Sequence, residues 1–532
     1  MNTLTGTGAL MRLILRRDRW IMPFWMLFLA ILPSVVAGAL AELYPSAAGL
    51  AAFARGISSN PAEIAFLGPV FAPTLGGLTA WRVGASNGIL IAIASFLTVI
   101  RHTRTEEEQG RRELLGAGVV GRHAPLVAAL LVTLGANAVI AVISVATMRS
   151  TGLPLAGAVA LALGIAGVGS VWAGMGALAA QLTESAGGAK SIAGVALAVA
   201  YVFRALGDIS IDTGLGWLRW LSPVGWVHQI RAFAGERWWV LALFGGVTLA
   251  LSAAALVLST RRDLGSGIVP PRPGPALAGP GLRNPLALAW RLHRDTLLVW
   301  TVGFAALGGV FGFAAQTITE QLNASPQMQL LLRALGRGAS VGDGFFTFIT
   351  VVIAEVAGVF ALQATLRLRG EETAQRLDPL LASAVKRSTW AWSHLVFALG
   401  GAALVLGAFG AGAGISYGLA TDGVGRQLPR LVGSALAYVP AVWVLVGLTT
   451  ALFGVMPRWT AGGWVVLIGC LLLDLFGQLF GLSERVMDIS PFHHVPKTLM
   501  GTPSYTAVGV LLIIAAGLLA VGLVGWQRRD VG

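Results

Sequence analysis

The sequence contains little charge for its length. Only 11% of its 532 residues are Asp, Glu, Lys or Arg, whereas soluble domains average about 25%. Hydrophobic residues reach 56%, and a soluble fold could not keep so much apolar surface from water with so few charges. The composition therefore excludes a cytosolic enzyme, a secreted domain and a DNA-binding protein, despite the net charge of +13. It predicts an all-α polytopic membrane protein.

Cysteine and two common catalytic motifs are also scarce or missing. Cys470 is the single cysteine, so neither an internal disulfide nor a cysteine metal cluster can form. The motifs GxxxxGK[ST] and HExxH do not occur. We predict no catalytic residue, no metal and no cofactor in this chain. If the protein uses ATP, a partner subunit must bind the ATP and its magnesium.

Apolar stretches long enough to cross a bilayer recur along the whole chain. A hydrocarbon core of about 30 Å requires about 20 apolar residues per helix, and helices are expected because lipid cannot satisfy free backbone groups. We predict twelve spanning helices, six in each half. They lie near 20–41, 83–101, 125–147, 153–181, 190–207 and 238–259, and near 296–318, 345–366, 390–412, 431–455, 460–482 and 505–526.

Basic residues are concentrated in alternate loops. If the N-terminus is inside, 24 of the 37 Lys and Arg residues lie in segments that face the cytoplasm. This bias sets the orientation of membrane proteins, so we expect both termini in the cytoplasm of a bacterial cell. The competing interpretation of the first span is a cleavable signal sequence ending at Ala39–Ala41. The length of the apolar run and an uncleavable counterpart at 296–318 favour retention.

The chain repeats itself once. Arg261–Gly265 recurs as Arg528–Gly532 at an offset of 267 residues, and Ser222–Pro223 recurs as Ser490–Pro491 at an offset of 268. Because each half has six spans, both halves are expected to enter the membrane in the same direction, as parallel repeats. The predicted parts are a first half over 1–265, a proline-rich cytoplasmic linker over 266–285 and a second half over 286–532.

A charged segment follows the second span of each half. Residues Arg101–Leu115 read RHTRTEEEQGRRELL, and a weaker copy at 367–381 follows at an offset of 265. A solvated loop is the simpler interpretation. The recurrence favours a rigid helix at the inner face that receives force from a soluble partner. The residues predicted to couple to that partner are Arg104, Glu106, Glu107, Glu108, Arg111 and Glu113, with Arg369, Glu371, Glu372, Arg376 and Asp378 in the copy.

Helical spacing makes a specific prediction about the charges of this segment. If the helix is continuous, side chains four residues apart face each other and opposite charges stabilise it by a few tenths of a kcal/mol. The expected pairs are Glu107 with Arg111, Glu108 with Arg112 and, in the copy, Glu372 with Arg376.

Three ionisable residues lie inside predicted spans, where their cost makes them functional candidates. Arg204 and Asp474 occupy similar places in the two halves, each three residues before a glycine. One hypothesis is that they form a buried ion pair between the halves; the competing interpretation is that each meets water or another partner. Glu355 has no acidic counterpart, because Leu90 stands 265 residues earlier. It could meet a cationic substrate, a proton or a structural hydrogen-bond partner.

Three stretches resemble a known family. Arg104–Leu115, Arg204–Asp208 (RALGD) and Leu221–Trp226 (LSPVGW) are similar to the membrane subunit of bacterial ABC-2 type exporters. The most similar branch exports polyketide antibiotics such as tetronasin. The resemblance extends over nearly the whole chain and is clearest in the first half.

This resemblance implies a function and an architecture. It implies a permease driven by a separate ATP-binding cassette ATPase, in two copies, that exports lipophilic drugs or antibiotics. It also implies particular segments: coupling helices at 102–116 and 367–381, interfacial connecting helices at 9–19 and 286–295, and outer re-entrant helices at 208–237 and 483–504.

Two alternatives remain from the residues themselves. Twelve spans in two parallel halves also suit a proton-coupled secondary multidrug transporter, in which Glu355 and Asp474 would bind protons. A membrane enzyme acting on lipid-linked substrates would need paired carboxylates or a metal site at an interface, and the sequence offers no convincing example.

Overall fold

The computed structural model describes most of the chain as helix. It divides into two compact units, Met1–Gly274 and Pro275–Gly532, which are considered separately below. The described residues are 3–58, 61–112, 120–209, 214–263, 265–269, 277, 279, 282, 284–323, 341–421, 423–476, 483–499 and 506–530. Most of the predicted linker over 266–285 therefore lies outside them.

The predicted fold class is confirmed. Eleven helices are long and apolar enough to cross a membrane, and the described residues contain no strand. Eleven of the twelve predicted spans lie on these helices. The remaining one, predicted over 460–482, begins on the shorter apolar helix α20 (Gly462–Phe476), and residues 477–482 are outside the described part. The chain is thus an all-α multi-pass membrane protein.

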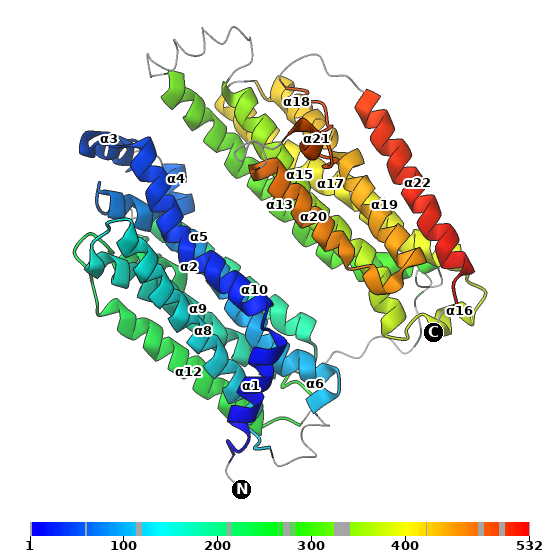
Figure 1. Ribbon diagram of the computed structural model, residues 1–532, viewed down its shortest axis with the longest axis horizontal. Coiled ribbons are helices and arrows are strands. Elements are labelled where there is room, and N and C mark those ends of the chain that lie inside the picture. Colours follow the sequence, from blue (N-terminus) through cyan, green and yellow to red (C-terminus); the bar gives the residue numbers. More distant parts are fainter. Residues whose placement is uncertain are drawn as a thin grey trace. The chain divides into compact units, whose positions relative to one another are not determined.

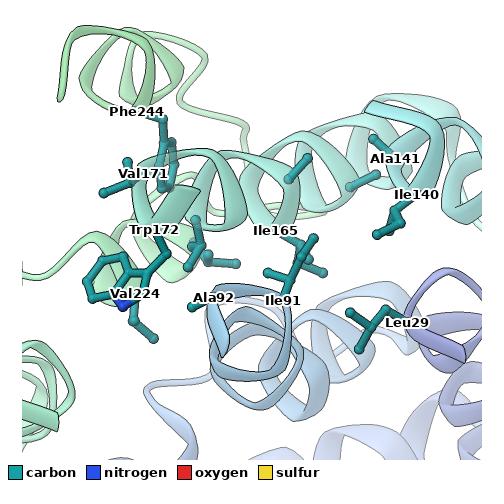
Figure 2. Close-up of a cluster of buried hydrophobic side chains, with 14 of the residues drawn as sticks. Leu29, Ile91, Ala92, Ile140, Ala141, Ile165, Val171, Trp172, Val224 and Phe244 are labelled. Atoms are coloured by element: carbon teal, nitrogen blue, oxygen red, sulfur yellow. The ribbon is translucent and has the colours of Figure 1, made fainter. Parts of the chain in front are cut away.

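The first unit is a bundle built around α9 (Leu155–Leu182), which packs against α5 (Leu75–Ile100), α8 (Ala124–Ser150) and α12 (Val240–Thr260) (Figure 1). Large and small apolar side chains interdigitate there, with Ile165 of α9 next to Ile91 of α5 and Trp172 of α9 near Val224 of α11 (Pro223–Gln229) (Figure 2). The other helices of this unit are α1 (Thr7–Arg17), α2 (Ile21–Leu43), α3 (Ala47–Ser58), α4 (Pro61–Leu67), α6 (Glu106–Glu108) and α10 (Ala186–Ile209).

The second unit has its own core, in which α17 (Arg387–Ala420) packs against α13 (Pro285–Asn323) and α15 (Val341–Thr373). On another side, α19 (Val439–Val455) packs along α22 (Thr506–Arg528) (Figure 1). The shorter helices of this unit are α16 (Asp378–Leu381), α18 (Val424–Leu436) and α21 (Glu484–Met487), together with α20.

The starts of the two units differ. In the first, α1 is a separate helix that buries Leu10 and Ile14 and ends at Asp18, where the backbone leaves helical geometry. In the second, the predicted interfacial helix over 286–295 is the first part of α13, which continues unbroken for 39 residues. The residues expected to form this connecting helix are thus helical but continuous with the seventh span, and their interfacial role stays a prediction.

The segments predicted as outer re-entrant helices are short and irregular. Ser222 accepts a hydrogen bond from the Gly225 N–H at 3.2 Å and so caps α11, which begins at Pro223. Ser and Pro at these two positions favour a helix start. Trp226 of α11 is buried against Phe244 of α12, with ring centroids 5.2 Å apart. In the second unit the described part of the matching segment, 483–499, contains the one-turn helix α21 and a series of turns.

Glycine allows the closest approach between two spanning helices. A methyl group on Gly522 of α22 would lie 2.4 Å from the Thr450 carbonyl oxygen of α19, whereas one on Gly517 would meet no atom within 4 Å. Membrane helices pack through such small residues.

We expect opposite effects from alanine at these two positions of α22. Gly522→Ala should lower the melting temperature of the purified protein, because overpacking costs about 1–3 kcal/mol. Gly517→Ala should leave it unchanged or raise it, since alanine favours helix by up to about 1 kcal/mol. A fluorescence melt in detergent measures both. Equal melting temperatures would contradict the tight α19–α22 contact.

Candidate functional site

A long helix carries the first charged segment away from the bundle. Helix α5 continues through the π-helical residues 101–105 into α6, which gives 34 helical residues from Leu75 to Glu108. At 1.5 Å per residue it measures about 51 Å, well beyond a hydrocarbon core of about 30 Å. It ends at Gly110, whose φ of +70° is left-handed and whose N–H donates to the Glu107 carbonyl at 3.0 Å. Glycine is the residue best suited to this helix ending.

Glu107 is the centre of a buried network at this helix end. Its carboxylate accepts two hydrogen bonds from Arg262, at 2.6 and 2.8 Å, and one from the Gly265 N–H at 2.7 Å. Arg112 lies 3.0 Å and Arg104 3.3 Å from the same carboxylate. Burial lowers the pKa of Arg112, and the charge of Glu107 opposes that shift. We call Arg104, Glu107, Arg112 and Arg262 the first charged junction.

Arg262 connects three elements of the first unit. It follows the end of α12, it pairs with Glu107 at the end of α5, and its Nε donates to Gln181 of α9 at 2.8 Å. A bidentate guanidinium–carboxylate contact is directional as well as strong. The junction therefore locks the ends of α5, α9 and α12 together.

The second unit repeats this arrangement. Glu372, which matches Glu107 in the repeat, pairs with Arg529, which matches Arg262. Arg369 also contacts Glu372 at 2.7 Å, as Arg104 contacts Glu107. The chain again turns at a left-handed residue, Gln375, whose φ is +55° and whose N–H donates to the Glu372 carbonyl at 3.0 Å. We call Arg369, Glu372 and Arg529 the second charged junction.

A second matched arginine supports each junction. Arg122, at the start of the third span, donates to the Arg262 carbonyl at 3.2 Å. Its repeat partner Arg387 donates to the Arg529 carbonyl at 2.6 Å. The duplication seen in the sequence is therefore present in the side-chain contacts as well.

The predicted i,i+4 pairs within this segment were wrong. Arg111 lies 3.3 Å from Glu106, and Arg376 lies 3.5 Å from Glu371. Arg112 similarly pairs with Glu107 instead of Glu108. The reason is the left-handed residue at the end of each helix, which turns the following arginine back by one position.

The predicted coupling residues that the structure describes fall into three groups. Arg104 and Glu107 are buried in the first junction, and Glu372 lies in the second with 9% of its side chain exposed, next to the half-buried Arg369. Glu106 pairs with Arg17 as well as Arg111, Glu371 with Arg367 as well as Arg376, and Glu108 accepts a hydrogen bond from the Ala186 N–H at 2.9 Å. The charges most available to a partner are Arg111, Arg376 and Asp378. Glu113 lies outside the described residues.

The sequence did not reveal one further contact that supports the first junction. Asp18, after α1, is buried between His102 at 2.6 Å and Arg101 at 3.2 Å. Its sequence match Asp295 is exposed and meets only its neighbour Arg294 among the described ion pairs. The second unit instead buries the matching region with a His293–His394 contact of 3.0 Å. Matching acids thus have different roles in the two halves.

The charged residues inside the spans each contact groups of their own unit. Arg204 is fully buried in α10, lies 3.4 Å from Asp208 and donates to the Phe66 carbonyl at 3.0 Å. Asp474 of α20 accepts a hydrogen bond from Ser490 at 2.6 Å. The pairing of Arg204 with Asp474 stays a hypothesis. Glu355 of α15 is buried, and its one side-chain hydrogen-bond partner among the described residues is Asp474.

The described residues offer no support for catalytic chemistry. They contain no group of three His, Cys, Asp or Glu side chains that could hold a metal. The string Gly84–Gly88 reads GxSxG, but it lies inside α5, and the Ser86 hydroxyl donates to the Arg82 carbonyl at 3.1 Å. A nucleophile elbow requires a sharp strand-to-helix turn instead. A second such string, 338–342, lies largely outside the described part.

We expect Glu107→Gln to destabilise the first unit. Removing one partner of a buried ion pair costs about 3–5 kcal/mol, because the other charge stays buried. The matched control is Asp263→Asn, an exposed acid next to Arg262. Melting temperatures of the purified variants should fall only for Glu107→Gln, and the same result is expected for Glu372→Gln against Asp378→Asn. Equal values for variant and control would exclude a structural role for the junction.

Comparison with known proteins identifies the family of the chain. The family profile described as the C-terminal domain of the multidrug efflux system permease Rv1217c matches residues 282–527. The multidrug efflux system permease protein Rv1217c of Mycobacterium tuberculosis is 41% identical over 530 residues, which cover 99% of this chain and 95% of that protein. At this identity and coverage the chain belongs to the family of the multidrug efflux system permease Rv1217c.

Proposed function

We propose that this transmembrane efflux permease is the membrane subunit of an ABC-2 type exporter, driven by separate ATP-binding cassette subunits that dock at the two charged junctions. The matched geometry of these junctions carries the proposal. Each one locks a long spanning helix to the end of its own bundle and leaves charges beyond it exposed. Two equivalent sites suit two copies of one partner.

Several observations support a separate motor. The chain has no nucleotide-binding motif of the P-loop type, so ATP hydrolysis requires another chain. The relative is named as the permease protein of a system, a word that implies further components. A buried ion-pair network is rigid enough to transmit a push from a docked partner into the spanning helices.

We further propose that the substrates are lipophilic drugs or antibiotics, with polyketides of the tetronasin type as the finer possibility. The relative's name includes multidrug efflux. The first unit contains an open groove of about 770 Å³ between α8, α9 and α12, lined mostly by apolar side chains such as Leu134, Val142 and Phe244. Apolar walls impose weak specificity, so several compounds could be carried. We also propose that both termini lie in the bacterial cytoplasm.

A second candidate is a proton-coupled secondary multidrug transporter. The observation that favours it is that the buried Glu355 and the half-buried Asp474 line the same cavity in the second unit. The repeated junctions favour the ATP-driven exporter, because a secondary transporter has no need for two matched docking sites.

The test is drug transport into inverted vesicles that contain the permease and the ATPase encoded beside it. Addition of ATP should drive uptake, and the ATPase should co-purify with the permease. Uptake that continues without ATP and stops when the proton gradient collapses would refute the proposal.

Charge reversal at the exposed arginines tests the docking sites separately. The double variant Arg111→Glu with Arg376→Glu should lower co-purification and ATP-driven uptake by about tenfold, the effect of losing about 1.4 kcal/mol of contact. Its melting temperature should stay normal, because both side chains are exposed. Arg55→Glu, in α3 at the predicted outer face, is the control. Unchanged coupling in the double variant would exclude these sites.

A further inference from the structure

A cavity in the second unit has features that the repeat does not explain. It has a volume of about 340 Å³ and lies among α15, α20, the residue before α19 and the segment after α21. Its walls are largely apolar and aromatic, with Phe348, Phe492 and Tyr438 among them. Two carboxyl side chains, Glu355 and Asp474, also line it.

Glu355 lacks a counter-charge among the described residues at this cavity. It is 99% buried, and its one side-chain hydrogen-bond partner among the described residues is a second acid, Asp474, which brings no positive charge. A buried ionised group without a counter-charge is strongly unfavourable, so such groups normally pair with another group or neutralise. The described part of the cavity therefore contains an acid that lacks its counter-charge.

The carboxylates around the cavity outnumber the positive charges of the described residues by one. Besides the two carboxylates, the titratable side chains that line it are Lys497, His493 and Tyr438. Lys497 can balance one carboxylate, and a neutral histidine and tyrosine balance none. Among the described residues that line the cavity, one positive charge is missing when both acids are ionised.

The corresponding place in the first unit contains an acid together with its positive partner. At an offset of 266, within the range of the other repeat matches, Asp474 corresponds to Asp208. Arg204 neutralises Asp208 from one turn earlier in α10, at 3.4 Å. The residue one turn before Asp474 is Cys470, so this counter-charge is absent, and Glu355 replaces Leu90. Compared with the first half, the second half thus has one arginine fewer and one acid more at this place.

We infer that this cavity is a binding site for an organic monocation with an aromatic or apolar body, such as a quaternary ammonium or pyridinium compound. The inference rests on the proposed export function and names one substrate class for it. The cation would face Glu355, with Asp474 held in place by Ser490 at 2.6 Å. The aromatic walls add cation–π attraction.

A metal ion suits this cavity less well. Calcium takes six to eight oxygen ligands and magnesium six, whereas only two carboxylates face this cavity. The apolar walls would leave such an ion poorly coordinated. A volume of about 340 Å³ lies at the lower end of the range for small-molecule sites, which suits a compact aromatic cation.

The experiment is equilibrium binding to the purified full-length permease in nanodiscs, without ATPase. The probe is 1-methyl-4-phenylpyridinium, which carries a permanent charge, and its uncharged analogue is 4-phenylpyridine in mildly alkaline buffer. The wild type should bind the cation and not the analogue. Glu355→Gln should weaken binding of the cation by at least about tenfold, since it removes a buried charge partner.

Two further variants sharpen this test. Cys470→Arg recreates the arrangement of the first unit and should also abolish binding, because the protein then supplies the missing charge. Asp343→Asn is the matched control: Asp343 is a buried acid on the same helix, already paired with Arg430 at 2.7 Å, and should leave binding unchanged. Melting curves identify any variant that fails to fold.

Equal binding of both probes, unchanged affinity in Glu355→Gln, or no binding to the wild type would overturn the inference. In the last case the cavity would hold only a proton. None of these three outcomes affects ATP-driven uptake of neutral drugs. Failure of the cation site can therefore be distinguished from failure of the proposed exporter function. Conversely, cation binding without ATP-driven transport would support the site and refute the motor.

Discussion

The structure of each half depends on one buried carboxylate at the end of a long helix. Glu107 and Glu372 each hold an arginine that lies more than 150 residues further along the chain. Such an ion pair is expensive to desolvate and is weak evidence for stability as such. Its value here is geometric, since it fixes the end of the last spanning helix to the end of the second one. The two bundles share this fastening and little of their detailed packing.

The two halves differ in the charged residues of their spanning helices. The first half neutralises its intramembrane acid internally, with Arg204 and Asp208 on one helix. The second half has an acid at the matching place, another in Glu355 and no arginine. The duplication gives two similar helix bundles. The absence of one positive charge is enough to make the charged site of the second bundle different from that of the first. The two halves therefore have similar charged junctions and different charged residues within their spanning helices.

The sequence predicted the parts that depend on local pattern. Apolar runs locate spanning helices because lipid imposes the same length on each, and the repeat was visible because charged motifs stand out against an apolar background. The pairing of Glu107 with Arg262 was accessible in principle, since both residues were recognised as repeated. The sequence analysis did not predict this pair because the two residues are far apart in the chain, and the repetition of two motifs does not show that they are in contact. The helix ends at Gly110 and Gln375 depend on a single left-handed residue each, which helical spacing overlooks.

The uninterrupted helix α13 has a mechanical consequence. Its 39 residues form a rod of about 58 Å, while the corresponding part of the first half is jointed at Asp18. A displacement at the start of α13 is transmitted along one continuous helix to its far end. In the first half, a displacement of α1 would act first on the chain turn at Asp18 and its contacts with Arg101 and His102. Equal displacements at the starts of the two halves would therefore move their first spanning helices by different amounts, and the movement would be larger in the second half.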